Sequence, residues 1–354
     1  MSTITRQPYQ SPVVASALSG AQLPLWAPRV VLASGIALAA ALRWGLGMGL
    51  VPAVLIAWFA MVVALPIWSL LVEGSRKATD RLATTLVSSA FAVALVPLVS
   101  IVSKVAQEGG SALSANFFSY SMRNVIGEGG GIYHALIGTV LVTAGAAVIS
   151  IPIGLFTAIY LVEYGKGNRL GNAITFLVDV MTGIPSIVAG LFAYALFAVF
   201  FGPGIRLGIG GSVALSVLMI PVVVRSCEEM LKLVPNELRE ASYALGVPKW
   251  RTILKVVLPT ALAGIVTGVT LSIARVIGET APLLLIAGTT AGVNFNLFDG
   301  RMQTLPVFAF SQQSSPGAFP EVALERAWGA ALVLMIIVMI VQASRHSTIH
   351  QETV

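Results

Sequence analysis

Hydrophobic residues occur in eight long runs, separated by polar and charged residues. The runs cover residues 30–42, 46–72, 82–105, 134–160, 173–201, 210–224, 256–286 and 328–341. A helix rises about 1.5 Å per residue, so about 20 apolar residues cross the bilayer core. The first run is the shortest: either Arg29 and Arg43 extend from its ends to the headgroups, or the segment is a re-entrant hairpin. The pattern predicts an all-α polytopic membrane protein.

The composition agrees with this pattern and excludes several classes of protein. Of the 354 residues, 56% are hydrophobic and only 10% are charged, whereas an ordinary soluble domain is about 25% charged. So few charges cannot cover a water-facing surface, which excludes a soluble enzyme, a coiled coil and a disordered chain. The net charge of +6 is typical of inner-membrane proteins and predicts no binding to nucleic acid.

The basic residues predict the orientation of the spans. With the N-terminus inside, 14 lysines and arginines fall in cytoplasmic segments and 6 on the opposite side, while Arg275 lies within a span. Cytoplasmic loops carry the excess of basic residues, so both termini are expected on the cytoplasmic side of a bacterial inner membrane.

The sequence contains no recognisable catalytic, metal or nucleotide site. The phosphate-binding motif GxxxxGK[ST] is absent, and the one cysteine, Cys227, can form no intramolecular disulfide. The three histidines are far apart, and no nucleophile–histidine–acid set is visible. We therefore expect no cofactor, no metal and no intrinsic enzymatic activity. If the protein takes part in ATP-driven transport, the ATPase is another chain.

The longest cytoplasmic segment, residues 225–255, predicts a short helix, a tight turn and a second helix. Asn236 is expected as the N-cap of the first helix, with acidic residues in the first turns. Gly246 lies where a left-handed C-cap belongs, and Pro248 suits the start of the next helix. Acid and base alternate on the polar face, which favours a protein groove over lipid. The apolar stripe consists of Leu238, Ala241 and Leu245.

The same segment resembles the EAA loop of binding-protein-dependent ABC-importer permeases. Its pattern is matched by Glu240-Ala241-Ser242, by Gly246 after three further residues, and by Leu258-Pro259 after a longer interval. In that family the loop is the coupling helix, which docks into the ATPase subunit. The residues that the resemblance assigns to ATPase coupling are Glu237, Glu240, Ala241, Gly246, Leu258 and Pro259.

Two further stretches narrow the resemblance to the phosphate importers. Residues 274–284, ARVIGETAPLL, are similar to the signature that follows the EAA loop in the PstA family, whereas the sister PstC family lacks the APLL ending. Residues 179–190, DVMTGIPSIVAG, resemble the corresponding span of both families. The resemblance implies a six-span type I permease core and does not cover residues 1–72, where two extra hydrophobic segments precede the core.

The expected organisation therefore has four parts. A polar cytoplasmic tail, residues 1–29, is followed by the extra membrane segments, residues 30–72. The permease transmembrane domain occupies residues 82–345 and includes the coupling loop 225–255. A second cytoplasmic tail, residues 346–354, ends the chain.

Polar residues inside the predicted spans are candidates for the translocation pathway, since a charge in the bilayer costs at least about 2.5–3.5 kcal/mol. They are Asp179, Arg275, Glu279 and Thr280. Arg275 and Glu279 are four residues apart and would share one helix face. Either Arg275 attracts a hydrated oxyanion while Glu279 holds its guanidinium in place, or the two form a salt bridge that locks two helices together. Asp179 is expected to cap a helix or to pair within the bundle, with Arg275 as one possible partner.

The resemblance implies a permease subunit of an ATP-driven importer of inorganic phosphate. Its partners would be a PstC-like permease, two PstB-like ATPases and an external PstS-like phosphate-binding protein, with membrane lipid around the spans. A permease for another oxyanion or small solute is the first alternative. A membrane-embedded enzyme or an assembly factor is the alternative from a different class, and it would need a catalytic cluster in the spans. A passive channel would not need an EAA loop.

Overall fold

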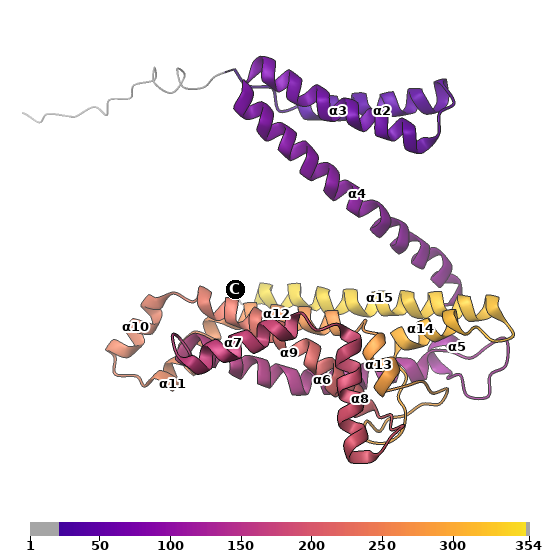
Figure 1. The fold of residues 1–354 in the computed structure, drawn as a ribbon, viewed down its shortest axis with the longest axis vertical. Coiled ribbons are helices and arrows are strands. Elements are labelled where there is room, and N and C mark those ends of the chain that lie inside the picture. The colour runs from indigo at the N-terminus through magenta and orange to yellow at the C-terminus, as the bar shows by residue number, and fades with distance from the viewer. Residues whose placement is uncertain (1–20, 352–354) are drawn as a thin grey trace, which may run out of the picture. The chain divides into compact units, whose positions relative to one another are not determined.

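The computed structural model of the protein describes residues 21–351. About 77% of the chain is helical and the described part contains no strand, which confirms the all-α prediction. Residues 1–20 of the expected N-terminal tail and residues 352–354 of the C-terminal one lie outside the described residues. The chain divides into two compact units, Met1–Ile101 and Val102–Val354 (Figure 1), and the division falls inside one helix.

The first unit holds the extra hydrophobic segments. Its elements are α2 (Ala27–Ala40), the π-helical turn η1 (Ala41–Gly45), α3 (Leu50–Val72) and the first part of α4 (Ser75–Ala112). With η1, α2 forms an apolar helix of 19 residues, which is long enough to cross a membrane. Trp26 lies against Trp68, with ring centroids 6.2 Å apart, and Gly35 leaves room for the side chain of Met61. α2 and α3 therefore pack as a hairpin.

A buried carboxylate closes one end of this hairpin. Glu73 lies between α3 and α4 and accepts hydrogen bonds from Arg81 Nε (2.7 Å), Ser69 Oγ (2.7 Å) and the backbone N–H of Leu23 (2.9 Å). The hydrogen bond from Arg81 and then that from Ser69 hold the pKa of Glu73 far below its ordinary value. The carboxylate therefore ties the chain before α2 to the turn between α3 and α4.

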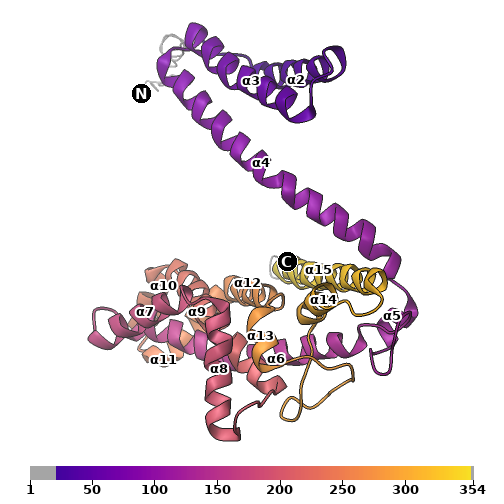
Figure 2. The ribbon, with the colours of Figure 1, turned by 45° about the vertical axis from the view of Figure 1, so that its right-hand side comes forward.

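The second unit holds the stretches that resemble the permease core. Its elements after α4 are α5 (Ala115–Ser119), α6 (Tyr133–Ile159), η2 (Tyr160–Tyr164), α7 (Arg169–Thr182), α8 (Ser186–Phe201), α9 (Gly208–Leu233), α10 (Asn236–Ala244), α11 (Lys249–Thr252), η3 (Ile253–Val257), α12 (Leu258–Val276), α13 (Ala281–Ile286), α14 (Leu305–Ser314) and α15 (Pro320–Gln351). Figures 1 and 2 show α15 lying along α12 and α14, while α10 and α11 form one end of the unit.

α9 is the central helix of this unit, and small residues let its neighbours approach it closely. In α6, a Cβ atom on Gly154 would lie 2.6 Å from Val223 of α9. In α12, a Cβ atom on Gly268 would lie 2.5 Å from the Cβ of Ser226. Small residues at helix interfaces allow this approach in membranes, where lipid tails are as apolar as leucine. Ser212 of α9 adds an interhelical hydrogen bond of 2.9 Å to the carbonyl of Val142.

The hydrophobic run 173–201 does not form one straight helix. It is divided into α7 and α8, which meet at an angle of 108°. The break lies immediately before Pro185, which lacks an N–H group and disfavours helical geometry in the preceding residue. Within the described residues, seven helices are long and apolar enough to cross a membrane, or eight if this bent pair is one span.

The helices around residues 225–286 do not begin and end where the hydrophobic runs do. A continuous helix runs through α11, η3 and α12 and ends at Val276, and residues 277–280 then leave the helix before α13 begins. Pro282 at the start of α13 suits a new helix, because its missing N–H is unpaired there in any case. α9 continues past Arg225, the predicted start of the cytoplasmic segment, and ends at Leu233.

The two broken segments pack against each other. A Cβ atom on Gly190 in α8 would lie 2.5 Å from the Cα of Pro282 in α13. Such a distance to a backbone atom is closer than real Cβ atoms come, so this approach requires glycine. The stretches 179–190 and 274–284, which carry the resemblance to the phosphate importers, therefore meet in the fold.

We predict that Gly190→Ala destabilises the protein, although alanine favours a helix over glycine by about 1 kcal/mol. The clash involves backbone atoms of Pro282, which no side-chain rotation can relieve. Gly110→Ala in α4 is the matched control, because a Cβ atom there meets nothing within 4 Å. Thermal unfolding of the purified protein in detergent compares the two. A melting temperature of Gly190→Ala at or above that of Gly110→Ala would contradict the prediction.

Candidate functional site

The expected coupling helix is present as α10 (Asn236–Ala244). Its N-cap position is occupied by Pro235, with no side-chain cap, so the expectation of Asn236 as N-cap is wrong by one residue. Glu237 lies in the first turn, where a negative charge favours the positive end of the helix. Glu240 is on the exposed surface. The helix therefore offers carboxylates to a partner from its first two turns.

Gly246 ends α10 in a Schellman motif. Its φ of +75° lies in the left-handed region, as the sequence predicts. The N–H of Gly246 donates to the carbonyl of Tyr243 (2.9 Å), and the N–H of Val247 donates to the carbonyl of Ser242 (3.2 Å). Beneath this turn, the buried hydroxyls of Ser242 and Thr252 form a hydrogen bond of 2.8 Å. The turn between α10 and α11 is therefore closed by both backbone and side-chain bonds.

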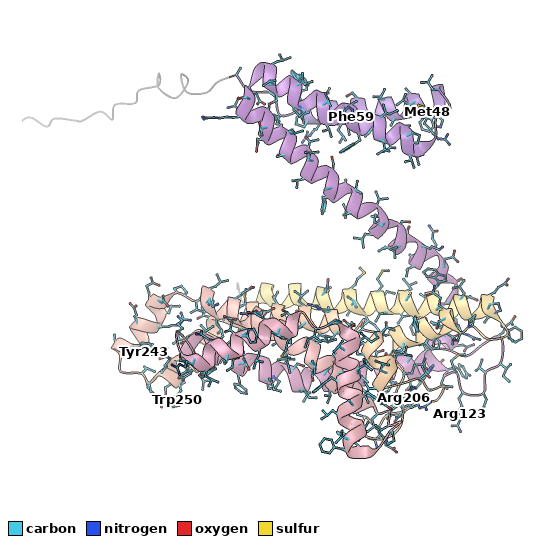
Figure 3. All side chains as sticks on the ribbon, viewed as in Figure 1. Met48, Phe59, Arg123, Arg206, Tyr243 and Trp250 are labelled. Carbon is cyan, nitrogen blue, oxygen red and sulfur yellow. The ribbon has the colours of Figure 1, made fainter. Side chains whose placement is uncertain are left out.

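Apolar side chains cover the outer face of this turn. Leu238 is 42% exposed and Leu245 is 83% exposed, and Ala241 between them is exposed as well. Tyr243 and Trp250 are also exposed, and Figure 3 shows them at the same end of the unit. Single exposed apolar residues are ordinary, but the stripe of Leu238, Ala241 and Leu245 along one side of an exposed helix is typical of an interaction surface.

A buried ion pair attaches α10 to the membrane-spanning helices. Arg239 Nη2 lies 3.0 Å from the carboxylate of Glu163, and the side chains are only 11% and 5% exposed. Arg239 also donates to the carbonyls of Val234 (2.6 Å) and Leu231 (2.9 Å) at the end of α9. One guanidinium therefore holds three elements together: α10, the end of α9 and the η2 turn after α6.

Lys249 makes a second attachment. Its ammonium group donates to the backbone carbonyl of Glu163 and lies 4.6 Å from the ring centroid of Tyr164. The sequence pattern does not indicate a functional role for Glu163, Arg239 or Lys249. The only signal was an acidic residue at the end of an apolar run, because the partners of Glu163 are 76 and 86 positions away.

Leu258 and Pro259 begin α12 inside the long helix. Leu258 packs on the core around α9, whereas Pro259 is exposed. The π-turn η3 directly precedes them. A local widening of this kind accommodates a residue that cannot donate to the helix ladder. The two residues therefore lie where α11 enters the membrane helix and not on the exposed face of α10.

The structure does not bring Arg275 and Glu279 together as predicted. Arg275 is exposed in the last turn of α12, while Glu279 and Thr280 lie in the non-helical break, half-buried. The expected pairing assumed a helix that continues past residue 279, but α12 ends at Val276. No ion pair of Arg275 or of Glu279 occurs among the described residues.

Asp179 has a different partner from the one considered. It pairs with Arg225 of α9, which also donates to Glu228 (2.8 Å), and Glu228 in turn pairs with Lys232 (2.7 Å). These four residues form a continuous chain of charges between α7 and the last turns of α9. The expectation that Asp179 pairs within the bundle is met, and the possible pair with Arg275 is not formed.

In the described part of the chain, no group of three or more histidine, cysteine, aspartate or glutamate side chains is placed to hold a metal ion. The polar groups at the break are one guanidinium, one carboxylate and one hydroxyl. Such a set can attract and release an oxyanion.

Comparison with known proteins connects this geometry to a family. Residues 150–346 match the family model described as binding-protein-dependent transport system inner membrane component. The phosphate transport system permease protein PstA 1 of Mycobacterium tuberculosis (strain H37Rv) is 47% identical over 266 residues, which cover 74% of this chain and 85% of that protein. The phosphate transport system permease protein PstA of Pasteurella multocida is 39% identical over 267 residues, covering 75% and 92%.

Among solved structures, a chain of the MetNI methionine ABC transporter in an inward-facing conformation is 21% identical. It aligns with a TM-score of 0.48 over 62% of this chain and 94% of that one. The matched region of the family model includes α9, the anchored helix α10 and both breaks. The chain belongs to the family of binding-protein-dependent transport system inner membrane components.

Proposed function

We propose that this protein is a transmembrane permease subunit of an ATP-driven importer for inorganic phosphate, which forms the translocation pathway with a second permease subunit. The observation that carries the proposal is α10, an exposed helix with an apolar face that a buried ion pair anchors to the spans. The names of the relatives, which are phosphate transport permeases, support the substrate. A permease for another oxyanion is the second candidate, since a guanidinium does not distinguish among oxyanions by charge alone.

Two structural connections would transmit a displacement of α10 to the translocation pathway. The first runs through Arg239 to Glu163 at the end of α6 and to the last carbonyls of α9. The second runs along the continuous helix from Lys249 to Val276, which ends beside the break. A partner that pushes on α10 therefore changes the surroundings of Arg275. The sequence has no GxxxxGK[ST] motif, so we assign ATP hydrolysis to separate PstB-like ATPase subunits.

At the break, Arg275 is the residue that attracts phosphate. It is exposed and free of a carboxylate partner among the described residues, so its charge is available to a ligand. Its planar fork can donate two parallel hydrogen bonds to phosphate oxygens. Thr280 supplies a hydroxyl donor, and Glu279 repels the anion enough to prevent permanent binding. Asp179 has a positioning role, because its bond to Arg225 holds α7 against α9.

The remaining surfaces suit the other subunits of such an importer. Many large apolar side chains outside the core are exposed, and a PstC-like permease and lipid would cover them. The loops at the end opposite α10 would receive an external PstS-like phosphate-binding protein. The distribution of 14 against 6 basic residues supports an orientation with α10 and both termini on the cytoplasmic side.

We predict that Gly246→Val weakens the association of the protein with its ATPase and therefore lowers transport. Valine at a φ of +75° costs about 1–2 kcal/mol, which opens the Schellman turn and displaces the docking face. Gly167→Val is the matched control, since Gly167 also has a positive φ (+77°) with nothing within 4 Å of a Cβ atom, but lies between η2 and α7. Co-purification of the ATPase and phosphate uptake in proteoliposomes should fall only for Gly246→Val. Equal behaviour of the two variants would contradict the assignment of α10.

We predict that Arg275→Gln abolishes phosphate uptake while the assembled complex and its basal ATP hydrolysis survive. Arg275 has no ion-pair partner among the described residues, so its removal leaves no buried carboxylate unpaired. Arg275→Lys should keep partial uptake at most, because lysine retains the charge without the fork. Arg169→Gln, at an exposed arginine of α7, should transport normally. Loss of thermal stability together with uptake would instead indicate that Arg275 has a structural role.

A further inference from the structure

Backbone hydrogen bonds bring three distant segments together beyond the end of α13. The N–H of Leu207 donates to the carbonyl of Ile286 (3.0 Å), and the N–H of Met302 donates to the carbonyl of Ala287 (3.1 Å). The residues that precede these two donors are both arginines, Arg206 and Arg301. The fold therefore places two guanidinium side chains beside one helix end, although 95 positions separate them in the sequence.

Both arginine side chains approach the same glycine. A Cβ atom on Gly288 would lie 2.9 Å from Cδ of Arg206 and 3.5 Å from Cδ of Arg301. Gly288 has a φ of +76°, a conformation that favours glycine, and a Cβ atom there would require the side chain of Arg206 to move. Arg206 is half-buried and Arg301 is exposed. Figure 3 labels Arg206 beside α13, away from Tyr243 and Trp250 at the coupling end.

Neither arginine has an acidic partner within the described residues, where the ion pairs are all made by other side chains. Two neighbouring positive charges repel each other, and a shared anion removes that repulsion. Arginine forks match the geometry of phosphate oxygens and donate to them in pairs. The arrangement therefore has the chemistry of a phosphate-group site.

Arg206 and Arg301 lie close to the proposed translocation pathway. α13 begins directly after Thr280 and ends at Ile286, so its six residues separate the break from the arginines by about 9 Å along the helix. A ligand at the arginines is thus one short helix away from Arg275 and Thr280. The pair also lies at the end of the unit away from α10, where the proposed function places the entry of substrate.

We propose that Arg206 and Arg301 form an oxyanion site that binds a phosphate group at the outer mouth of the translocation pathway, before it reaches Arg275. This inference rests on the proposed function. Two sources can supply the group: free phosphate, or the headgroup of a phospholipid. The second source arises because an apolar groove of about 370 Å³ adjoins the site, lined by Phe197, Phe201, Leu207, Ile209 and Phe298.

The test uses the complete transporter in nanodiscs with Arg206→Gln, Arg301→Gln and the double variant. Arg123→Gln is the matched control, because Arg123 is an exposed arginine in the loop after α5, labelled in Figure 3. Binding of radioactive inorganic phosphate to the transporter without its external binding protein is the first measurement. Each single change should weaken binding by about tenfold, as expected for hydrogen bonds to a charged group. The control should bind as the unchanged protein does.

The second measurement is the amount of phosphatidylglycerol that remains with the detergent-purified complex. Weaker phosphate binding with unchanged lipid assigns the site to free phosphate, and loss of the lipid with unchanged phosphate binding assigns it to a headgroup. Unchanged phosphate binding and unchanged lipid in the double variant would overturn the inference. Phosphate uptake by the unchanged transporter is the test of the proposed function. If the unchanged transporter does not import phosphate, the proposed function is wrong. If it does import phosphate, a negative result for the double variant contradicts only the site at Arg206 and Arg301.

Discussion

Close contact between backbones around α9 is the constraint on which the rest of the second unit depends. Lipid offers no hydrophobic reason for apolar helices to associate, so their packing relies on contacts that only small residues permit. Gly154 of α6 and Gly268 of α12 each lie directly against α9. Ser212 of α9 adds a hydrogen bond to α6. With α6 and α12 fixed against α9, the elements attached to their ends take defined positions.

Two of those elements are breaks in membrane-spanning segments, before Pro185 and at residues 277–280. A break leaves backbone polar groups without helical partners, and such groups are tolerated in a membrane only where protein or water satisfies them. The contact between Gly190 and Pro282 joins the short helices that follow the two breaks. The fold thus concentrates irregular backbone in one region, while regular helices connect that region to α10.

The sequence predicted the features that depend on neighbouring residues. The turn at Gly246 follows from a glycine after an amphipathic stripe, and its φ of +75° agrees. The helix breaks were harder to predict, because Pro185 and Pro282 are equally compatible with kinks in continuous helices. The pairing of Arg275 with Glu279 failed for this reason, since their spacing of four has meaning only within one helix.

The pattern of residues along the chain could not predict contacts between distant segments. Asp179 and Arg225 are 46 positions apart, and the sequence around each one resembles an ordinary polar helix end. The arginines beside Gly288 are still further apart and belong to loops without a regular pattern. Such pairs are set by tertiary packing, so only the fold reveals which charges face one another.

The separation of Glu163 from Arg239 also affects how the protein is made. Spans enter the membrane in the order of synthesis, and 76 positions lie between the two partners. Until α10 has left the ribosome, the Glu163 carboxylate has no guanidinium to pair with and must stay hydrated at the membrane edge. A chain that stops before α10 keeps this carboxylate and the last carbonyls of α9 open to water, so an incomplete product differs from the finished protein at a defined surface.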